Sequence, residues 1–137
     1  CLSIAARITR HLSPAWKAEF GLTVISWRVM AVIGRFAPVS AKQVAARTST
    51  DAFFVARAID KLVEQGYVQK DVDHEDRRRL RLSLTPSGKK VHRQVEDMIN
   101  AVEAELLAGI PSDESAIFFR VMSVLEDRTG ALASIPS

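Results

Sequence analysis

The sequence predicts a mainly α-helical protein with a small β-hairpin. Apolar residues recur at intervals of three and four along most of the 137-residue chain, which is the spacing of one helix face. Two short segments, residues 67–72 and 80–84, instead alternate apolar and polar residues as strands do. Glycine (6) and proline (5) are few, and the high aliphatic content excludes a disordered chain. The length indicates one domain with a sizeable core.

Two helices are expected at the start of the chain. The first covers residues 1–20, and Pro14 should kink it or end it near Leu12, because a proline inside a helix loses a hydrogen bond and clashes with the preceding turn. The second covers residues 24–36 and is capped by Thr23. It is apolar around most of its circumference, which predicts burial on several sides.

Ser40 begins a pair of short helices. Together with Gln43 it forms a capping-box pattern, which satisfies free N–H groups at a helix start. The first helix of the pair should begin at Ala41 and end at Thr48-Ser49-Thr50, whose side chains compete with the backbone for hydrogen bonds.

The second helix of the pair covers about residues 51–65. Thr50 or Asp51 can cap it, the apolar residues between positions 55 and 63 recur at helical spacing, and Gly66 closes it. Two helices joined by so short a turn match a helix-turn-helix. The second helix of that motif lies in the major groove of DNA, with its first residues nearest the bases.

A β-hairpin follows this pair, and its tip, residues 73–79, ends in Arg77, Arg78 and Arg79. Guanidinium groups bind phosphates and enter narrow minor grooves. An arginine run by itself fits a solvated surface loop equally well. One hairpin after a helix-turn-helix, it indicates DNA contact.

Two further helices should follow the hairpin. Proline in the first turn favours a helix from Pro86, whose apolar stripe continues over about twenty residues. The Gly-Ile-Pro segment 109–111 breaks it. Ser112 or Asp113 then caps a last helix that runs to about residue 131.

These motifs resemble the MarR family of winged helix-turn-helix transcription regulators over nearly the whole chain. The resemblance rests on Leu22-Thr23 opening a helix that contains Trp27, on residues 60–68, and on the segment from Asp76-Arg77-Arg78 through Leu84-Thr85-Pro86-Ser87-Gly88. In that family the Asp-x-Arg of the wing pairs a bracing carboxylate with an arginine that reaches the minor groove. The resemblance therefore implies these roles for Asp76 and Arg78, and phosphate contacts for Arg77 and Arg79.

The second helix of the pair departs from the family pattern. Phe53, Phe54 and Ala56 stand where small polar residues are usual, whereas the family's arginine is retained as Arg57. We expect one phenylalanine either to face the groove, where it could touch thymine methyl groups, or to pack against the first helix of the pair. Partial burial of both rings is the other interpretation. The residues expected to contact DNA are Lys42, Gln43, Thr50, Asp51, Arg57, Lys61, Arg77, Arg78 and Arg79.

Charge is unevenly distributed along the chain. Residues 1–93 contain 17 Lys and Arg against 8 Asp and Glu, a balance of +9, whereas residues 94–137 contain 2 against 8, a balance of −6. This uneven charge is expected if residues 1–93 face a polyanion such as DNA. An acidic helix whose charged side faces solvent is the other interpretation of residues 94–137.

The resemblance implies one MarR-like domain that forms a homodimer. Residues 1–20 and 86–137 are the expected dimerisation helices, and residues 21–85 are the head, the winged helix-turn-helix region. One head cannot cover all the apolar stripes, so the outer helices should interdigitate with a second copy. A three-helix bundle within one chain is the alternative. A dimer would span two half-sites of a pseudo-palindromic operator, roughly 34 Å apart.

Family members bind small, often aromatic acids in a cleft between the dimerisation helices and the head. The candidates that the resemblance implies here are His11, Trp16, Trp27, Arg28 and Met30. An arginine or histidine beside tryptophans could pair with a carboxylate over an aromatic wall. Core packing of Trp27 and Met30, and surface positions for His11 and Arg28, remain open.

Nothing in the sequence indicates catalysis, a cofactor or a metal site. It has no glycine-rich phosphate loop, its three histidines lack metal-ligand spacing, and Cys1 is its only cysteine, which favours an inert thiol. The absence of a membrane-length apolar run and of a signal peptide predicts a cytoplasmic protein without membrane contact. Two functions are compatible with these observations: a dimeric repressor released from double-stranded DNA by a small effector, and a winged-helix protein-interaction module without specific DNA binding.

Overall fold

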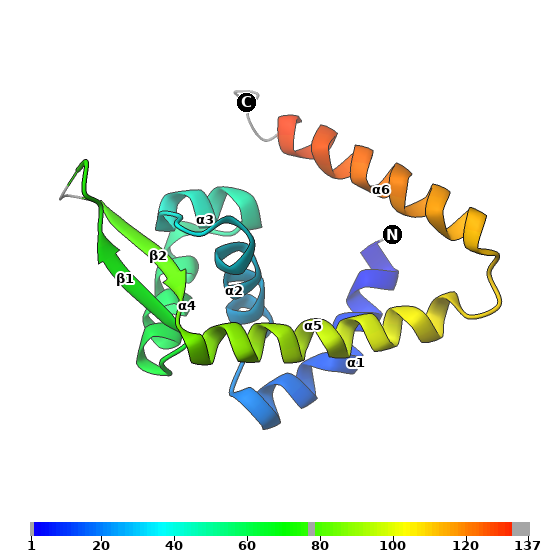
Figure 1. Ribbon diagram of the computed structural model, residues 1–137, viewed down its shortest axis with the longest axis horizontal. Coiled ribbons are helices and arrows are strands. Elements are labelled where there is room, and N and C mark those ends of the chain that lie inside the picture. Colours follow the sequence, from blue (N-terminus) through cyan, green and yellow to red (C-terminus); the bar gives the residue numbers. More distant parts are fainter. Residues whose placement is uncertain (1, 77–78, 133–137) are drawn as a thin grey trace. The chain divides into compact units, whose positions relative to one another are not determined.

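The computed structural model describes residues 2–76 and 79–132 (Figure 1). The helices and strands of these residues follow in the order α1 (Leu2–Phe20), α2 (Val24–Phe36), α3 (Ala41–Thr48), α4 (Ala52–Glu64), β1 (Val68–Val72), β2 (Leu80–Leu84), α5 (Pro86–Leu107) and α6 (Ser112–Leu132). The mainly helical fold with one small hairpin is thus confirmed. The chain divides inside α5 into two compact units, Cys1–Ile99 and Asn100–Ser137.

Helix α2 lies at the centre of the first unit and packs against α3, α4 and β2. Its Val29, Met30 and Ile33 are fully buried, and Trp27 is 8% exposed. Burial on several sides, expected from its apolar circumference, is therefore confirmed. Thr23 caps it as expected, since its Oγ1 accepts a hydrogen bond from the backbone N–H of Ser26 at 3.1 Å.

Helices α3 and α4 form the expected helix-turn-helix. The capping box at Ser40 and Gln43 is complete, and Ser49 ends α3 in the left-handed conformation with φ of 50°. Asp51 caps α4 by accepting a hydrogen bond from Phe53 N at 2.8 Å. Thr50 is not the cap, because its hydroxyl donates to the carbonyl oxygen of Thr48.

Strands β1 and β2 form an antiparallel hairpin, the wing, in which Val68 pairs with Leu84 and Val72 with Leu80. The first strand begins at Val68 rather than at Tyr67. The Tyr67 N–H is used by the Leu62 carbonyl at the end of α4, so this residue belongs to the turn. Leu82 also exchanges two backbone hydrogen bonds with Val39, which ties the wing to the segment before α3.

Helix α1 continues through Pro14, so the expected end near Leu12 is wrong. Leu12 and Trp16 flank the proline and are 5% and 3% exposed. Burial of both side chains holds the helix together across the missing hydrogen bond.

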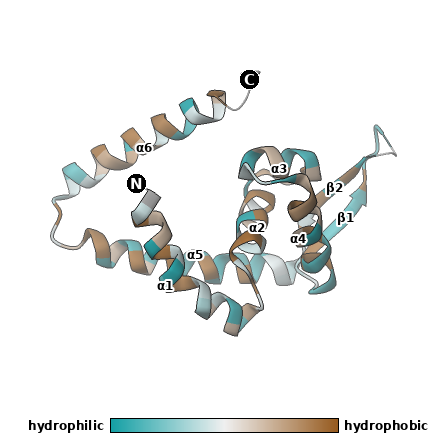
Figure 2. Cartoon of the chain, turned by 180° about the vertical axis from the view of Figure 1, so that it is seen from behind, coloured by the Kyte–Doolittle hydropathy of each residue, from teal (hydrophilic) through white to brown (hydrophobic). Residues whose placement is uncertain are grey.

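Helix α6 belongs to the second unit and has no buried residue. It begins at Ser112 itself, so neither Ser112 nor Asp113 precedes the helix as an N-cap should. Hydrophobic positions are visible along it in Figure 2. Its exposed large apolar side chains are Ile117, Phe118, Phe119, Val121, Val124, Leu125 and Leu132. None of the helices in the described part of the chain has the length and apolar character of a membrane span.

Candidate nucleic-acid interface

Helix α4 has one side that is buried in the core and one side that is exposed. Val55, Ile59 and Leu62 point into the core. Phe53 precedes Val55 by two positions, a rotation of about 200° around a helix, so it lies on the opposite side. Arg57, four residues after Phe53, follows it on the same exposed side.

The two phenylalanines are both exposed, Phe53 at 60% and Phe54 at 53%. At least one exposed ring was expected, and both rings are more than half exposed. Their rings meet nearly perpendicularly, with centroids 5.6 Å apart. The Arg57 guanidinium carbon lies 5.6 Å from the Phe53 centroid, within cation–π range. Phe53 lies opposite Val55 on the helix, and Phe54 lies at its flank, where it borders the hollow beside Ile25, so neither ring enters the core.

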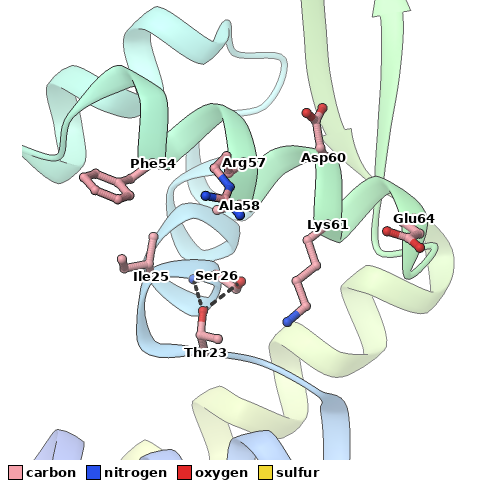
Figure 3. Close-up of a pocket in the computed structure, with 9 residues that line it drawn as sticks. All are labelled: Thr23, Ile25, Ser26, Phe54, Arg57, Ala58, Asp60, Lys61 and Glu64. Atoms are coloured by element: carbon pink, nitrogen blue, oxygen red, sulfur yellow. Dashed lines mark hydrogen bonds between the residues drawn. The ribbon is translucent and has the colours of Figure 1, made fainter.

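A shallow hollow of about 500 Å³ lies between α4 and the start of α2 (Figure 3). Phe54, Arg57 and Lys61 border it from α4, and Thr23 and Ile25 border it from α2. Figure 3 shows the Lys61 side chain extending toward α2, on the side away from Asp60. The structure therefore brings two predicted DNA contacts, Arg57 and Lys61, to one surface.

Thr50 and Asp51 lie just before the first residue of α4, and both side chains make local hydrogen bonds. The Asp51 carboxylate accepts from Phe53 N, and the Thr50 hydroxyl donates to the Thr48 carbonyl. That same carbonyl accepts a 2.8 Å hydrogen bond from Arg28 Nη2, which joins α2 to the end of α3. These bonds fix the backbone of the turn between the two helices.

A second hollow separates the start of α3 from the wing. It brings together three predicted contacts, Lys42, Gln43 and Arg79, and also includes Arg81 of β2. The Gln43 side-chain oxygen accepts a hydrogen bond from Ser40 N at 2.9 Å and so belongs to the capping box. Lys42, Arg79 and Arg81 place three cationic side chains around this hollow, of which Arg81 is paired with Asp73 and Arg79 lies near Asp76. Cationic side chains attract phosphate groups.

The wing tip is held by a carboxylate that the sequence did not single out. Asp73 accepts hydrogen bonds from the Glu75 N–H at 3.0 Å and from Arg81 Nε at 3.1 Å, and these two bonds lower the pKa of Asp73. The predicted brace, Asp76, has a carboxylate oxygen 3.7 Å from Arg79 Nε. An Asp that begins a turn after a strand is the signal that could have identified Asp73.

Arg77 and Arg78 lie outside the described residues. Their expected contacts with phosphates and with the minor groove therefore rest on the family resemblance.

The expected ligand residues are only partly brought together. Trp16 and Trp27 have ring centroids 5.9 Å apart, and the buried Nε1 of Trp16 has no hydrogen-bond partner among the described residues. Arg28 instead binds the end of α3, Met30 is fully buried in the core, and His11 is exposed.

His92 completes this aromatic cluster, and sequence reasoning missed it. Its ring centroid is 5.3 Å from that of Trp27, and its Nε2 lies 3.8 Å from a Glu96 carboxylate oxygen. A Cβ at Gly34 would come within 2.7 Å of His92 Nε2. The absence of a side chain at Gly34 is what lets α5 approach α2 here, and no periodic pattern in the sequence marks it.

Comparison with known proteins relates the central part of this chain to a family. Residues 20–79 match the model of the MarR family. Among similar solved structures, FabT of Streptococcus pneumoniae in complex with DNA is 20% identical, with 96% of this chain and 93% of that chain covered and a TM-score of 0.79. A MarR/EmrR family transcriptional regulator from Acinetobacter sp. ADP1 is 23% identical, with 93% and 89% covered and a TM-score of 0.75. The PcaV transcriptional regulator from Streptomyces coelicolor, in complex with its natural ligand, is 26% identical, with 90% and 89% covered and a TM-score of 0.65.

Proposed function

We propose, from the premise that residues 20–79 are a MarR-family winged helix-turn-helix region, that this protein is a sequence-specific DNA-binding transcription regulator. The observation that carries the proposal is the exposed side of α4. Arg57 and Lys61 project from it, and among the described residues neither forms an ion pair with a carboxylate. Cations without a carboxylate partner on the second helix of this motif are available to bases and phosphates.

A phosphate-binding surface next to α4 supports the same proposal. Lys42 and Arg79 border one hollow between α3 and the wing. Bases would be read by Arg57, Lys61 and the turn at Thr50 and Asp51, and phosphates would be held by Lys42, Gln43 and the wing arginines. FabT, a protein of similar fold, was solved with DNA bound.

The assembly that we propose is a homodimer on a pseudo-palindromic operator. The exposed apolar side chains of α6 need a partner, and a second copy offers the same surface with the same spacing. Two heads then contact half-sites one helical turn apart. We assign the protein to the cytoplasm, where its DNA would be.

The regulatory outcome that we propose is repression relieved by a small carboxylate ligand. Trp16 and Trp27 offer an aromatic wall, and the unpartnered Trp16 Nε1 offers a hydrogen-bond donor to an anionic oxygen. The ligand must bind more tightly to the state that does not fit DNA, because only a difference in affinity shifts the equilibrium. PcaV, a protein of similar fold, was solved with its natural ligand.

A fluorescence titration with genomic DNA fragments at several salt concentrations tests the proposal. Specific binding should weaken steeply as salt rises, with a slope that records the number of phosphates neutralised. Arg79→Ala should reduce that slope by about one. Weak binding that is insensitive to salt and equal for all fragments would contradict DNA recognition.

The exposure of Phe53 and Phe54 favours a second candidate function, a protein-interaction module that retains the winged fold. In that case the same titration gives flat, weak binding to every fragment.

A further inference from the structure

The aromatic pair on α4 lies where base contacts are made, which raises the question of what it binds. Phe53 and Phe54 are in the first turn of the helix, the part of such helices that comes nearest the bases. Both rings are more than half exposed. Phenylalanine has no hydrogen-bonding group, so its only specific partner on a major-groove edge is the thymine C5 methyl group.

Arg57, which lies beside Phe53, can contact a second base. The Arg57 guanidinium lies 5.6 Å from the Phe53 centroid on the same exposed side of α4. Arginine is the residue that binds guanine O6 and N7 with two parallel hydrogen bonds. Neighbouring bases of a strand are separated by a rise of about 3.4 Å, so two side chains 5.6 Å apart on one side of a helix are close enough to contact adjacent base pairs.

We infer that Phe53 and Arg57 form one reading unit for a guanine and an adjacent thymine, in which Arg57 binds the guanine edge and Phe53 packs against the thymine methyl group. This inference rests on the proposed function. It adds the chemistry of the bases that the protein prefers.

Phe54 is a positioning residue in this unit. Its ring stands at 75° to that of Phe53, with centroids 5.6 Å apart, so it limits the directions that the Phe53 ring can take. The side chain of Phe54 itself borders the hollow toward Ile25 of α2. It therefore supports Phe53 from the flank.

The size and charge of the patch favour DNA over a protein partner. Two phenylalanine side chains supply far less than the roughly 800 Å² that each partner buries in a stable protein interface. Arg57 and Lys61 adjoin the rings, and Lys42 lies at the start of the neighbouring helix α3. Double-stranded DNA is a polyanion that exposes thymine methyl groups in its major groove, so it fits both the small apolar area and the positive charge of this patch.

The experiment begins with enrichment of a preferred site from a random-sequence duplex pool by the full-length protein. Each thymine of that site is then replaced by uracil, which keeps the base pair and removes only the methyl group. Replacement of a thymine next to a guanine should weaken binding about fourfold, the loss expected for one methyl group removed from an apolar contact. Replacement of thymines elsewhere in the site should change nothing.

Variants connect the methyl effect to the side chains. The ratio of thymine to uracil affinity should fall to one in Phe53→Ala and to an intermediate value in Phe54→Ala. It should stay at about four in the control Glu103→Ala, which alters an exposed residue of α5 that borders neither hollow. Because the measured quantity is a ratio, a general weakening of binding does not affect it.

The outcomes separate this inference from the proposed function. If no sequence is enriched, DNA recognition fails and the inference fails with it. If a site is enriched but every uracil duplex binds as well as its parent, or Phe53→Ala keeps the ratio, then DNA recognition stands and the reading unit is overturned.

Discussion

Arg57 and Arg79 should differ in what they contribute to binding. Arg57 lies on the exposed side of α4, and Arg79 borders the hollow beside the wing. Arg57→Ala should cost about 1–3 kcal/mol on the preferred site and relax base preference, because a base contact is lost. Arg79→Ala should weaken binding to all sequences equally. Titration of both variants against the preferred site and a scrambled duplex measures the difference, and two variants that bind like the parent would contradict both assignments.

Asp73 makes the wing tip sensitive to acid. Its pKa is lowered from the ordinary value of 3.8 by the Glu75 N–H and the Arg81 guanidinium. A lowered folded-state pKa means that the stabilisation is complete above the unfolded value and is lost as pH falls through the folded one. The Glu75 amide should therefore exchange with solvent faster as pH falls below 3.8, after correction for the intrinsic rate. Asp73→Asn should abolish this additional pH dependence, and an unchanged profile would remove Asp73 from the role.

At the scale of elements, the joint between the wing and α5 depends on Gly88. A Cβ added there would lie 2.0 Å from the Tyr67 carbonyl oxygen, which is backbone and cannot move aside easily. Gly88→Ala should lower the free energy of unfolding by about 2 kcal/mol through overpacking. Urea denaturation of the full chain measures the change.

Gly130 is the matched control for that substitution. A Cβ there would meet nothing within 4 Å, and the residue lies inside α6. Gly130→Ala should raise stability by up to about 1 kcal/mol, since alanine is the better helix former. Equal effects of the two substitutions would show that helix propensity rather than packing decides the result at position 88.

Elements whose signals are local could be predicted from the sequence. The capping box at Ser40 and the cap at Thr23 depend on neighbours within three residues, and both were found where expected. The sequence leaves open whether α1 continues through Pro14 or ends before it, because the outcome depends on the burial of Leu12 and Trp16 against other parts of the fold.

The candidate site was less predictable than the fold for the same reason. The positions of Arg57 and Lys61 on α4 follow from helix periodicity. The exposure of both Phe53 and Phe54 depends on which face of α4 the core occupies. The contact of His92 with Trp27 requires the close approach at Gly34, where residues 58 positions apart in the chain meet. Patterns within one segment carry no information about contacts between residues that are far apart in the sequence.

At the scale of the whole molecule, the apolar surface of α6 should control assembly. Leu125 is 46% exposed and lies among other apolar side chains of this helix. Leu125→Asp should shift the protein from dimer to monomer in sedimentation experiments, because a carboxylate would be buried in the interface without a partner. The affinity for a duplex with two half-sites should fall as well. A monomer binds with one head only and loses the additional affinity of two linked heads that bind together.

Arg128→Ala provides a control for the assembly experiment. Arg128 is an exposed polar residue of the same helix, and its loss should leave the sedimentation profile unchanged. A parent protein that sediments as a monomer at every concentration would contradict the proposed dimer.

The division of α4 into a stripe that faces the core and a stripe that faces outward has an evolutionary consequence. Val55, Ile59 and Leu62 hold the helix in place, whereas Phe53 and Arg57 contribute nothing to that packing. Substitutions at the outer positions can therefore accumulate without passing through unfolded ancestors. A lineage built on this scaffold is free to acquire new target sequences one residue at a time, and a designer can exchange the same positions to redirect it.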